Sequence, residues 1–201
     1  MRVTGGIYSG RTVRCPKGVI RPSMDRMRES VFSILGNIEG LSFLDLFSGS
    51  GIIGIEAASR GASPVVLVEK DFIKKNVIRE NYSFVESDIS LRLMSVERYI
   101  QLAEPKSFNL IFLDPPFPRQ EKKKLIDKIG EKQILRDGGI LMIHYPAEDE
   151  LDRVEFEHFR LRDKRKYGRS IVLFFRNRSD EDHSWEQEVE NTEDNSCDSQ
   201  S

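Results

Sequence analysis

Short apolar runs alternate with longer amphipathic segments through the middle of this 201-residue chain. The runs where strands are expected lie at residues 43–47, 65–68, 84–85, 110–113 and 140–143. Strands that are apolar along their whole length are typical of a parallel sheet that is buried on both faces and connected by helices. The pattern therefore predicts a doubly wound α/β fold.

The two ends of the chain differ from this middle part. Two further strands are expected at residues 154–161 and 171–175, and they lie too close together for a long helix between them. They are predicted to form an antiparallel hairpin at the edge of a seven-stranded sheet. In the first twenty residues, glycines separate short apolar pairs, which predicts a β-hairpin. Apolar residues at helical spacing then predict an amphipathic helix over residues 24–35, ending near Gly36.

Charge divides the chain into two parts. Residues 179–201 contain nine acidic side chains and no Lys or Arg, so we expect a disordered acidic tail there. The preceding 178 residues contain 31 Lys and Arg against 24 Asp and Glu, a formal charge of about +7. This excess favours a polyanionic partner such as nucleic acid, although an ordinary solvated surface would give the same count. We expect one domain over residues 1–178, with an N-terminal extension (1–40) and a catalytic core (41–178).

Composition argues against several other classes of protein. Cys15 and Cys197 lie far apart, so neither a disulfide framework nor a metal centre is expected. The sequence has no apolar segment of membrane-spanning length and no signal peptide at Met1. We therefore expect a cytoplasmic protein that uses neither a membrane nor a metal.

A glycine-rich turn follows the first apolar run. Gly49, Gly51 and Gly54 lie where a strand is expected to lead into a helix, so backbone can approach a ligand closely. This spacing alone suits a nicotinamide dinucleotide equally well. Glu69, twenty residues after Gly49, could accept hydrogen bonds from ribose hydroxyls. Asp45 would face a ligand ammonium, which a pyrophosphate lacks, so S-adenosylmethionine is the favoured cofactor.

Two residues are candidates for binding the adenine of this cofactor. Asp88 is expected to follow the third strand, where it could accept a hydrogen bond from the adenine amino group, with Ile89 against the ring. A helix N-cap is a second interpretation of Asp88, because Asp favours that position.

A second motif, Asp114-Pro115-Pro116-Phe117, comes directly after the apolar run at residues 110–113. Proline lacks an N–H and pushes the residue before it into an extended conformation, so this loop offers many hydrogen-bond acceptors and few donors. A planar base amine needs such acceptors, and Phe117 could stack on the base. We expect these four residues to be catalytic, while a strand-ending turn with a core phenylalanine is the structural alternative.

The motifs resemble the RsmD family, bacterial methyltransferases that act on the exocyclic N2 of guanine in 16S ribosomal RNA. The resemblance spans about residues 1–177 and is carried by Asp45-Leu46-Phe47-Ser48-Gly49-Ser50-Gly51, Glu56-Ala57, the Asp-Pro-Pro-Phe loop, Gly5-Gly6, Gly10-Arg11 and the segment from Arg21 to Glu29. It implies a Rossmann-like class I methyltransferase fold, a monomer, and small-subunit RNA within an assembled subunit as substrate. The expected donor-site residues are Asp45, Phe47, Ser48, Gly49, Ser50, Gly51, Glu69, Lys70, Asp88 and Ile89.

An RNA substrate also needs contacts outside the reacting base. The residues expected to supply them are Arg11, Arg21, Arg26, Arg28, Arg119, Tyr167 and Arg169. His144, within an apolar strand end, is interpreted as structural. Two other functions stay open on the sequence: an adenine-N6 methyltransferase, which the acceptor loop permits equally, and a non-catalytic RNA-binding protein with the same fold.

Overall fold

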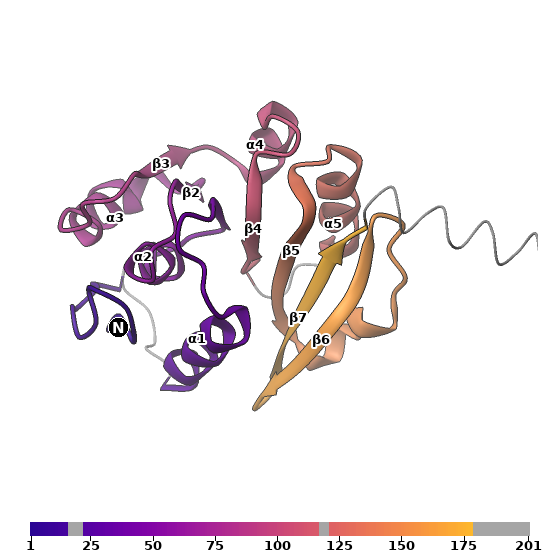
Figure 1. Cartoon of the computed structure of the whole chain (residues 1–201), viewed down its shortest axis with the longest axis horizontal. Coiled ribbons are helices and arrows are strands. Elements are labelled where there is room, and N and C mark those ends of the chain that lie inside the picture. Colours follow the sequence, from indigo (N-terminus) through magenta and orange to yellow (C-terminus); the bar gives the residue numbers. More distant parts are fainter. Residues whose placement is uncertain (16–21, 117–120, 179–201) are drawn as a thin grey trace, which may run out of the picture.

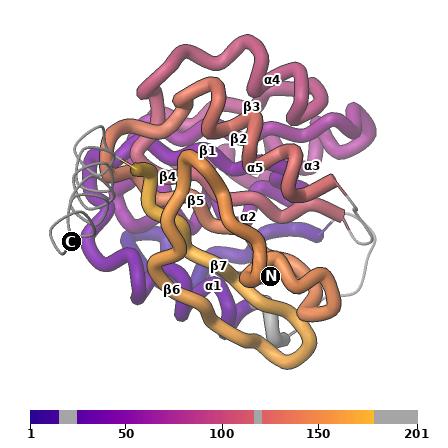
Figure 2. Tube along the Cα trace, turned by 90° about the vertical axis from the view of Figure 1, so that its right-hand side faces the viewer, coloured from indigo at the N-terminus to yellow at the C-terminus, as the bar shows by residue number. Residues whose placement is uncertain are grey.

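The computed structural model describes residues 1–15, 22–116 and 121–178. Its sheet has the strand order β3-β2-β1-β4-β5-β7-β6, parallel from β3 to β5 and antiparallel at β7 and β6 (Figures 1 and 2). The strands are β1 (Phe43–Leu46), β2 (Val65–Glu69), β3 (Ile89–Leu93), β4 (Phe108–Leu113), β5 (Leu135–Pro146), β6 (Phe159–Tyr167) and β7 (Ser170–Asn177). The predicted seven-stranded, mostly parallel sheet with a closing antiparallel hairpin is confirmed.

Helices cover both faces of this sheet (Figure 1). They are α1 (Pro22–Leu35), α2 (Ile52–Ser59), α3 (Lys75–Asn81), α4 (Val96–Leu102) and α5 (Lys122–Glu131), with short 3-10 helices η1 (Phe72–Lys74), η2 (Ala147–Asp149) and η3 (Leu151–Arg153). Successive strand residues point to opposite faces. On β1, Phe43 joins the core with α1, α2 and α3, while Leu44 joins the core with α4 and α5. This two-sided burial explains why the central strands are apolar throughout.

Two strand predictions were wrong, and both concern the edges of the sheet. The apolar pair at residues 84–85 lies in a turn, and the third strand is β3 at Ile89–Leu93, whose residues are only partly buried. The strand predicted at residues 154–161 is instead β6 at Phe159–Tyr167, most of which is exposed and charged. Edge strands keep charged side chains because these discourage pairing with other chains, so their apolar signal is weak.

The first fifteen residues form a small folded element that we call the N-terminal clasp. Arg2 and Thr12 form an antiparallel bridge, which confirms the predicted hairpin in a shortened form. The turn of the clasp presses against the end of α2: Ile7 N–H donates to the Ser59 carbonyl at 2.8 Å, and a Cβ on Gly6 would lie 1.8 Å from that same oxygen. The division into an extension (1–40) and a core (41–178) stays a prediction, and the acidic tail lies outside the described residues.

Candidate active site at the carboxyl edge of the sheet

The two sequence motifs meet at one edge of the sheet. β1 and β4 are parallel neighbours with Leu46 opposite Leu113, and the N–H of Asp114 donates to the Leu46 carbonyl at 3.2 Å. Ligands of open parallel sheets bind beyond the carboxyl ends of the strands. The glycine turn after β1 and the Asp-Pro-Pro loop after β4 therefore face the same space, as a methyl transfer between their ligands requires.

Tight backbone geometry shapes the turn between β1 and α2. Phe47 has a positive φ of 65°, and Gly49 and Gly51 follow with φ of 57° and 81°. A positive φ is costly for a residue with a side chain and is found often at functional sites. Gly54 is needed for another reason: a Cβ there would lie 2.2 Å from a methyl group of Leu67, so only glycine lets α2 pack this closely on β2.

Asp45, the third residue of β1, is buried with one oxygen unpartnered. Its side chain is 1% exposed, and Oδ2 accepts a hydrogen bond from Gly54 N–H at 3.0 Å. Oδ1 has no partner in the described structure, and the hydroxyl of buried Ser48 has none either. Burial raises the pKa of Asp45 to about 8, helped by the charges of Asp114 and Glu69 and opposed by the Gly54 hydrogen bond. The ammonium of S-adenosylmethionine fits this group, because its positive charge would stabilise the ionised form of Asp45 and satisfy Oδ1.

Glu69 ends β2 beside the glycine turn. It is buried, and its oxygens accept hydrogen bonds from Gly49 N–H (3.0 Å), Asp71 N–H (3.0 Å) and the Lys74 ammonium (3.2 Å). These contacts hold the carboxylate at the mouth of the turn, where its expected role as a ribose ligand is geometrically allowed. Lys70 follows it and is exposed.

The structure corrects the expected adenine contacts. Asp88 precedes β3, and Ile89 is its first residue, paired with Val65 at the start of β2. Both residues therefore lie at the amino ends of the parallel strands. Glu69 lies at the carboxyl ends, where it pairs with Leu93. Met94 N–H donates to the Glu69 carbonyl at 3.1 Å. The residues after Leu93 therefore occupy the position beside Glu69 where Asp88 was predicted. The error follows from the misplaced third strand.

The acceptor loop has a partner that the sequence interpretation missed. Asp114 is partly exposed, Pro115 is buried and Pro116 is exposed, while Phe117 lies outside the described residues. Nδ1 of buried His144 lies 2.8 Å from Asp114 Oδ1. The register explains this contact, because Leu113 on β4 pairs with Ile143 on β5 and the next residues of both strands are neighbours. His144 was interpreted as structural, but it holds the candidate catalytic carboxylate.

The expected arginine contacts to RNA divide into four groups. The prediction that Arg28 contacts RNA is wrong. Arg28 is 1% exposed and pairs with buried Glu56 at 3.2 Å and with Asp25 at 3.0 Å. Arg11 stacks over Phe84, in the connection that leads to the opposite edge of the sheet. Arg26 and Arg169 are exposed and remain available. Arg21 and Arg119 lie outside the described residues.

Tyr167 links the β6–β7 hairpin to the first helix. It ends β6, and its hydroxyl donates to Ser30 on α1 at 2.6 Å. Its partner across the hairpin, Ser170, pairs with Pro146 at the end of β5. Because β5 runs parallel to β4, the hairpin tip and α1 lie toward the same edge as Asp114.

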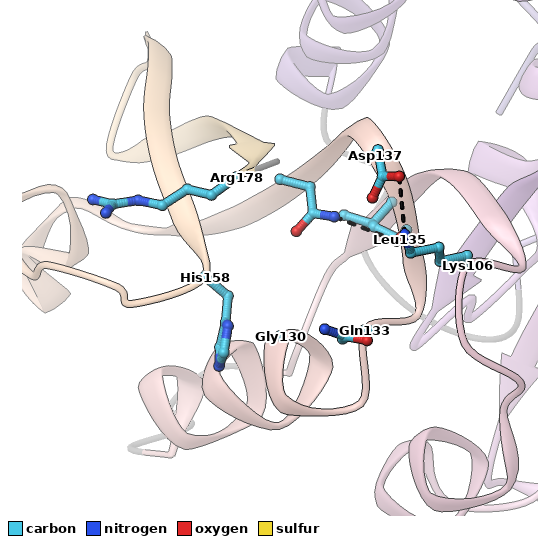
Figure 3. Close-up of a pocket in the computed structure, with 8 residues that line it drawn as sticks. Lys106, Gly130, Gln133, Leu135, Asp137, His158 and Arg178 are labelled. Atoms are coloured by element: carbon cyan, nitrogen blue, oxygen red, sulfur yellow. Dashed lines mark hydrogen bonds and ion pairs between the residues drawn. The ribbon is translucent and has the colours of Figure 1, made fainter. Parts of the chain in front are cut away.

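A separate cavity lies at the opposite edge of the sheet. It has a volume of about 120 Å³ and is lined by polar residues that include Lys106, Asp137 and His158 (Figure 3). Lys106 and Asp137 form an ion pair across it at 2.9 Å. Both flank the starts of β4 and β5, so this cavity does not belong to the candidate active site.

The described part of the chain lacks two further features. No group of three or more His, Cys, Asp or Glu side chains there could hold a metal ion. Nor does any helix in that part have the length and apolar character needed to cross a bilayer.

Comparison with known proteins gives consistent matches. The model of the family described as Conserved hypothetical protein 95 matches residues 1–176. A candidate rRNA methyltransferase of Bacillus subtilis (strain 168), YlbH, is 33% identical over 184 residues, covering 89% of this chain and 100% of YlbH. Ribosomal RNA small subunit methyltransferase D of Escherichia coli (strain K12) is 30% identical over 157 residues, covering 77% of this chain and 79% of that protein.

A solved structure agrees with the fold. A candidate methyltransferase from Escherichia coli, yhhF, superimposes with a TM-score of 0.79 at 24% identity, covering 89% of this chain and 98% of that one. The Rossmann-like methyltransferase fold is therefore confirmed.

Proposed function

The chain belongs to the family described as Conserved hypothetical protein 95, the RsmD family, and on that premise we propose that it methylates the exocyclic N2 amine of a guanine in small-subunit ribosomal RNA. S-adenosylmethionine is the methyl donor. The observation that carries the proposal is the adjacency of the two motifs, with Asp114 N–H bonded to Leu46 at the end of β1. The relatives named for ribosomal RNA methylation support the RNA substrate, and the acceptor loop supports an amine.

The donor side of the site is built to bind and orient. When bound, S-adenosylmethionine supplies a methyl group on a positively charged sulfur. Asp45 would accept a hydrogen bond from the amino group of the donor through its unpartnered Oδ1. Glu69 would hold the ribose, and the glycine turn lets the backbone approach the donor. These contacts fix the direction in which the methyl group points.

The acceptor side must activate a poor nucleophile. The lone pair of a guanine amine is delocalised into the ring, so its nitrogen must be drawn toward tetrahedral geometry before it attacks. Asp114 and the Pro115 carbonyl would accept hydrogen bonds from the two N–H groups of the amine and aim the lone pair at the methyl group. As the N–C bond forms, the S–C bond breaks, and one amine proton leaves to Asp114 or to water. His144 fixes the Asp114 carboxylate from the side. Alignment of this kind supplies up to roughly 7–11 kcal/mol of a barrier reduction, so orientation is the main contribution.

The target base has to leave its stack to reach such a pocket. Extrusion is least costly for an unpaired base, which favours a loop of the RNA. Arg26 on α1 and Arg169 at the hairpin tip are exposed and would hold the flanking backbone. We further propose an assembled small subunit as substrate, a monomeric enzyme without a metal, and a cytoplasmic location.

The test is a methylation assay with nucleoside analysis. The purified protein is incubated with isotopically labelled S-adenosylmethionine and either naked small-subunit RNA or small subunits from a bacterial strain that lacks the enzyme. Label in N2-methylguanosine, with the subunits as the better substrate, is the expected result. Label in N6-methyladenosine instead would replace the guanine assignment by the adenine-N6 function.

The Asp114→Ala variant is the matched control for this assay. It should bind the donor normally in calorimetry but lose turnover by about 10²-fold or more, because the amine is no longer held in line with the methyl group. Undiminished turnover would remove Asp114 from the mechanism, and failure of the parent protein to bind the donor would favour a non-catalytic RNA-binding protein.

A further inference from the structure

Two large exposed apolar residues are adjacent in sequence on η1, three and four residues after Glu69. Phe72 and Ile73 of η1 are 67% and 90% exposed. The other large exposed apolar residues, Ile7, Leu102 and Leu161, lie singly on the clasp, at the end of α4 and on β6. Isolated exposed apolar residues are common on protein surfaces, but an adjacent pair beside a ligand site calls for a partner.

The turn that carries this pair is held firmly in place. Asp71 caps η1 by accepting a hydrogen bond from Ile73 N–H at 3.0 Å, and its own N–H donates to Glu69 at 3.0 Å. Lys74, the last residue of η1, pairs with the same Glu69 carboxylate at 3.2 Å. Phe72 and Ile73 are therefore presented outward from a turn that is anchored to the donor-site carboxylate itself.

The charges around the pair are mostly positive. Lys70 and Arg79 are exposed and Lys75 is partly exposed, whereas Asp71 caps η1 and exposed Glu80 pairs with Arg14. An aromatic ring among basic side chains is the arrangement that binds single-stranded nucleic acid, because bases stack on the ring while cations neutralise the phosphates. A protein partner would gain less from these positive charges than a nucleic acid would, so the charges favour RNA.

We propose that Phe72 and Ile73 form a stacking platform for an unpaired nucleotide of the RNA that flanks the target guanine. This inference rests on the proposed function, because it assigns a second contact to the same substrate. η1 follows β2, and β2 lies two strands from β4, a separation of about 10 Å at the strand ends. A single strand that places one base at Asp114 can therefore reach the platform with a nearby nucleotide.

The platform is tested by the affinity for a short single-stranded oligouridylate, measured by fluorescence anisotropy with the full chain. Phe72→Ala should weaken binding by about 5- to 150-fold, the range expected for the loss of one stacked base. Phe72→Trp should restore it, since a tryptophan also stacks. Leu102→Ala, which removes an equally exposed apolar side chain from the end of α4, is the matched control and should leave the affinity unchanged.

Two further measurements separate this platform from other roles. The donor dissociation constant should be the same in Phe72→Ala and the parent protein, and a weakened donor would overturn the proposal by showing that the ring covers the adenosine. With small subunits as substrate, Phe72→Ala should raise KM and leave kcat unchanged. Unchanged oligouridylate affinity would also overturn it, even if guanine methylation is found; weakened affinity without any methylation would keep the platform and reject the proposed function.

Discussion

Two carboxylates are buried on neighbouring elements, and their surroundings differ sharply. Glu56 on α2 is fully buried and accepts hydrogen bonds from both N–H and hydroxyl of Thr4, from Gly5 N–H, and from Arg28 and Arg60. Asp45 at the end of β1 is equally buried, yet one of its oxygens has no partner in the described structure. Only the first of these carboxylates is satisfied by the protein alone.

The difference separates a structural group from a ligand site. A buried polar group without a partner destabilises the fold, so it is retained where something else supplies the missing partner. Glu56 joins the N-terminal clasp, α1 and α2 into one unit, and its five donors come from the clasp, from α1 and from Arg60, the C-cap of α2. Asp45 instead faces the carboxyl edge, where a cationic ligand group would complete it.

The largest expected effect is on stability, from Glu56→Ala. Removing one partner of a buried ion pair leaves the other charges uncompensated and costs about 3–5 kcal/mol. Chemical denaturation should show a loss of that size, because Arg28 stays buried with only the partly exposed Asp25 as its acidic partner. The control is Glu80→Ala, which breaks an exposed pair with Arg14 and should cost no more than about 1 kcal/mol. Equal losses in the two variants would contradict the structural role of Glu56.

The opposite result is expected of Asp45→Asn, which should affect binding more than folding. Losing a charged hydrogen bond of about 1.5–3 kcal/mol corresponds to donor affinity that is about 10- to 150-fold weaker in calorimetry. The affinity for 5′-methylthioadenosine, which carries the nucleoside and sulfur without the amino acid part, should not change. A similar loss for both ligands would show that Asp45 does not bind the ammonium.

A pH dependence of stability should reveal the ionisation of Asp45. Because the pKa of Asp45 is about 8 in the folded protein against 3.8 in the unfolded chain, the folded state holds an extra proton between these values. The resulting stability is fully present below about pH 4 and is lost as pH rises toward about 8, at up to about 1.4 kcal/mol per pH unit.

The Asp45→Asn variant lacks this titration. As pH rises from 5 to about 8, the unfolding free energy of the parent protein should therefore fall relative to that of the variant. Denaturant titrations of both proteins across this range measure the difference directly. A constant difference across the range would mean that Asp45 is already ionised in the folded protein.

The sequence predicted the centre of this molecule better than its edges. The apolar central strands, the glycine turn and the Asp-Pro-Pro loop are each specified by a few adjacent residues, and the resemblance to the RsmD family is confirmed by the family match. At the edges, β3 and β6 are partly exposed, so their polar positions hid them. Because β3 was predicted at the wrong position, Asp88 and Ile89 were predicted at the carboxyl ends of the strands, whereas they lie at the amino ends.

Long-range partners account for the other differences. Arg28 looked like a free surface charge because its partner, Glu56, lies 28 residues away on another helix. His144 looked structural because its contact with Asp114 depends on the register between β4 and β5. Once the strand order is known, that register identifies His144, because both residues directly follow paired positions. Helical spacing and local composition alone contain neither piece of information.

The smallest effect is expected at His144, whose carboxylate partner is intermediate between the two compared above. Asp114 has a protein partner at Oδ1 and remains partly exposed to the acceptor side. Replacing His144 by Leu should lower kcat by about tenfold. A hydrogen bond to a charged group contributes about 1.5–3 kcal/mol, and only part of that free energy orients Asp114 for the reaction. The donor dissociation constant and KM should stay unchanged.

His144→Asn tests whether positioning is the cause of that loss. An Asn amide nitrogen can take the place of Nδ1 and donate to Asp114, so this variant should recover most of the kcat lost in the Leu variant. Thermal unfolding of both variants shows whether they share any loss of packing. If Asn and Leu lower kcat equally while both fold normally, the histidine does not act through Asp114, and Asp114 then belongs with Asp45 as a carboxylate completed by its ligand alone.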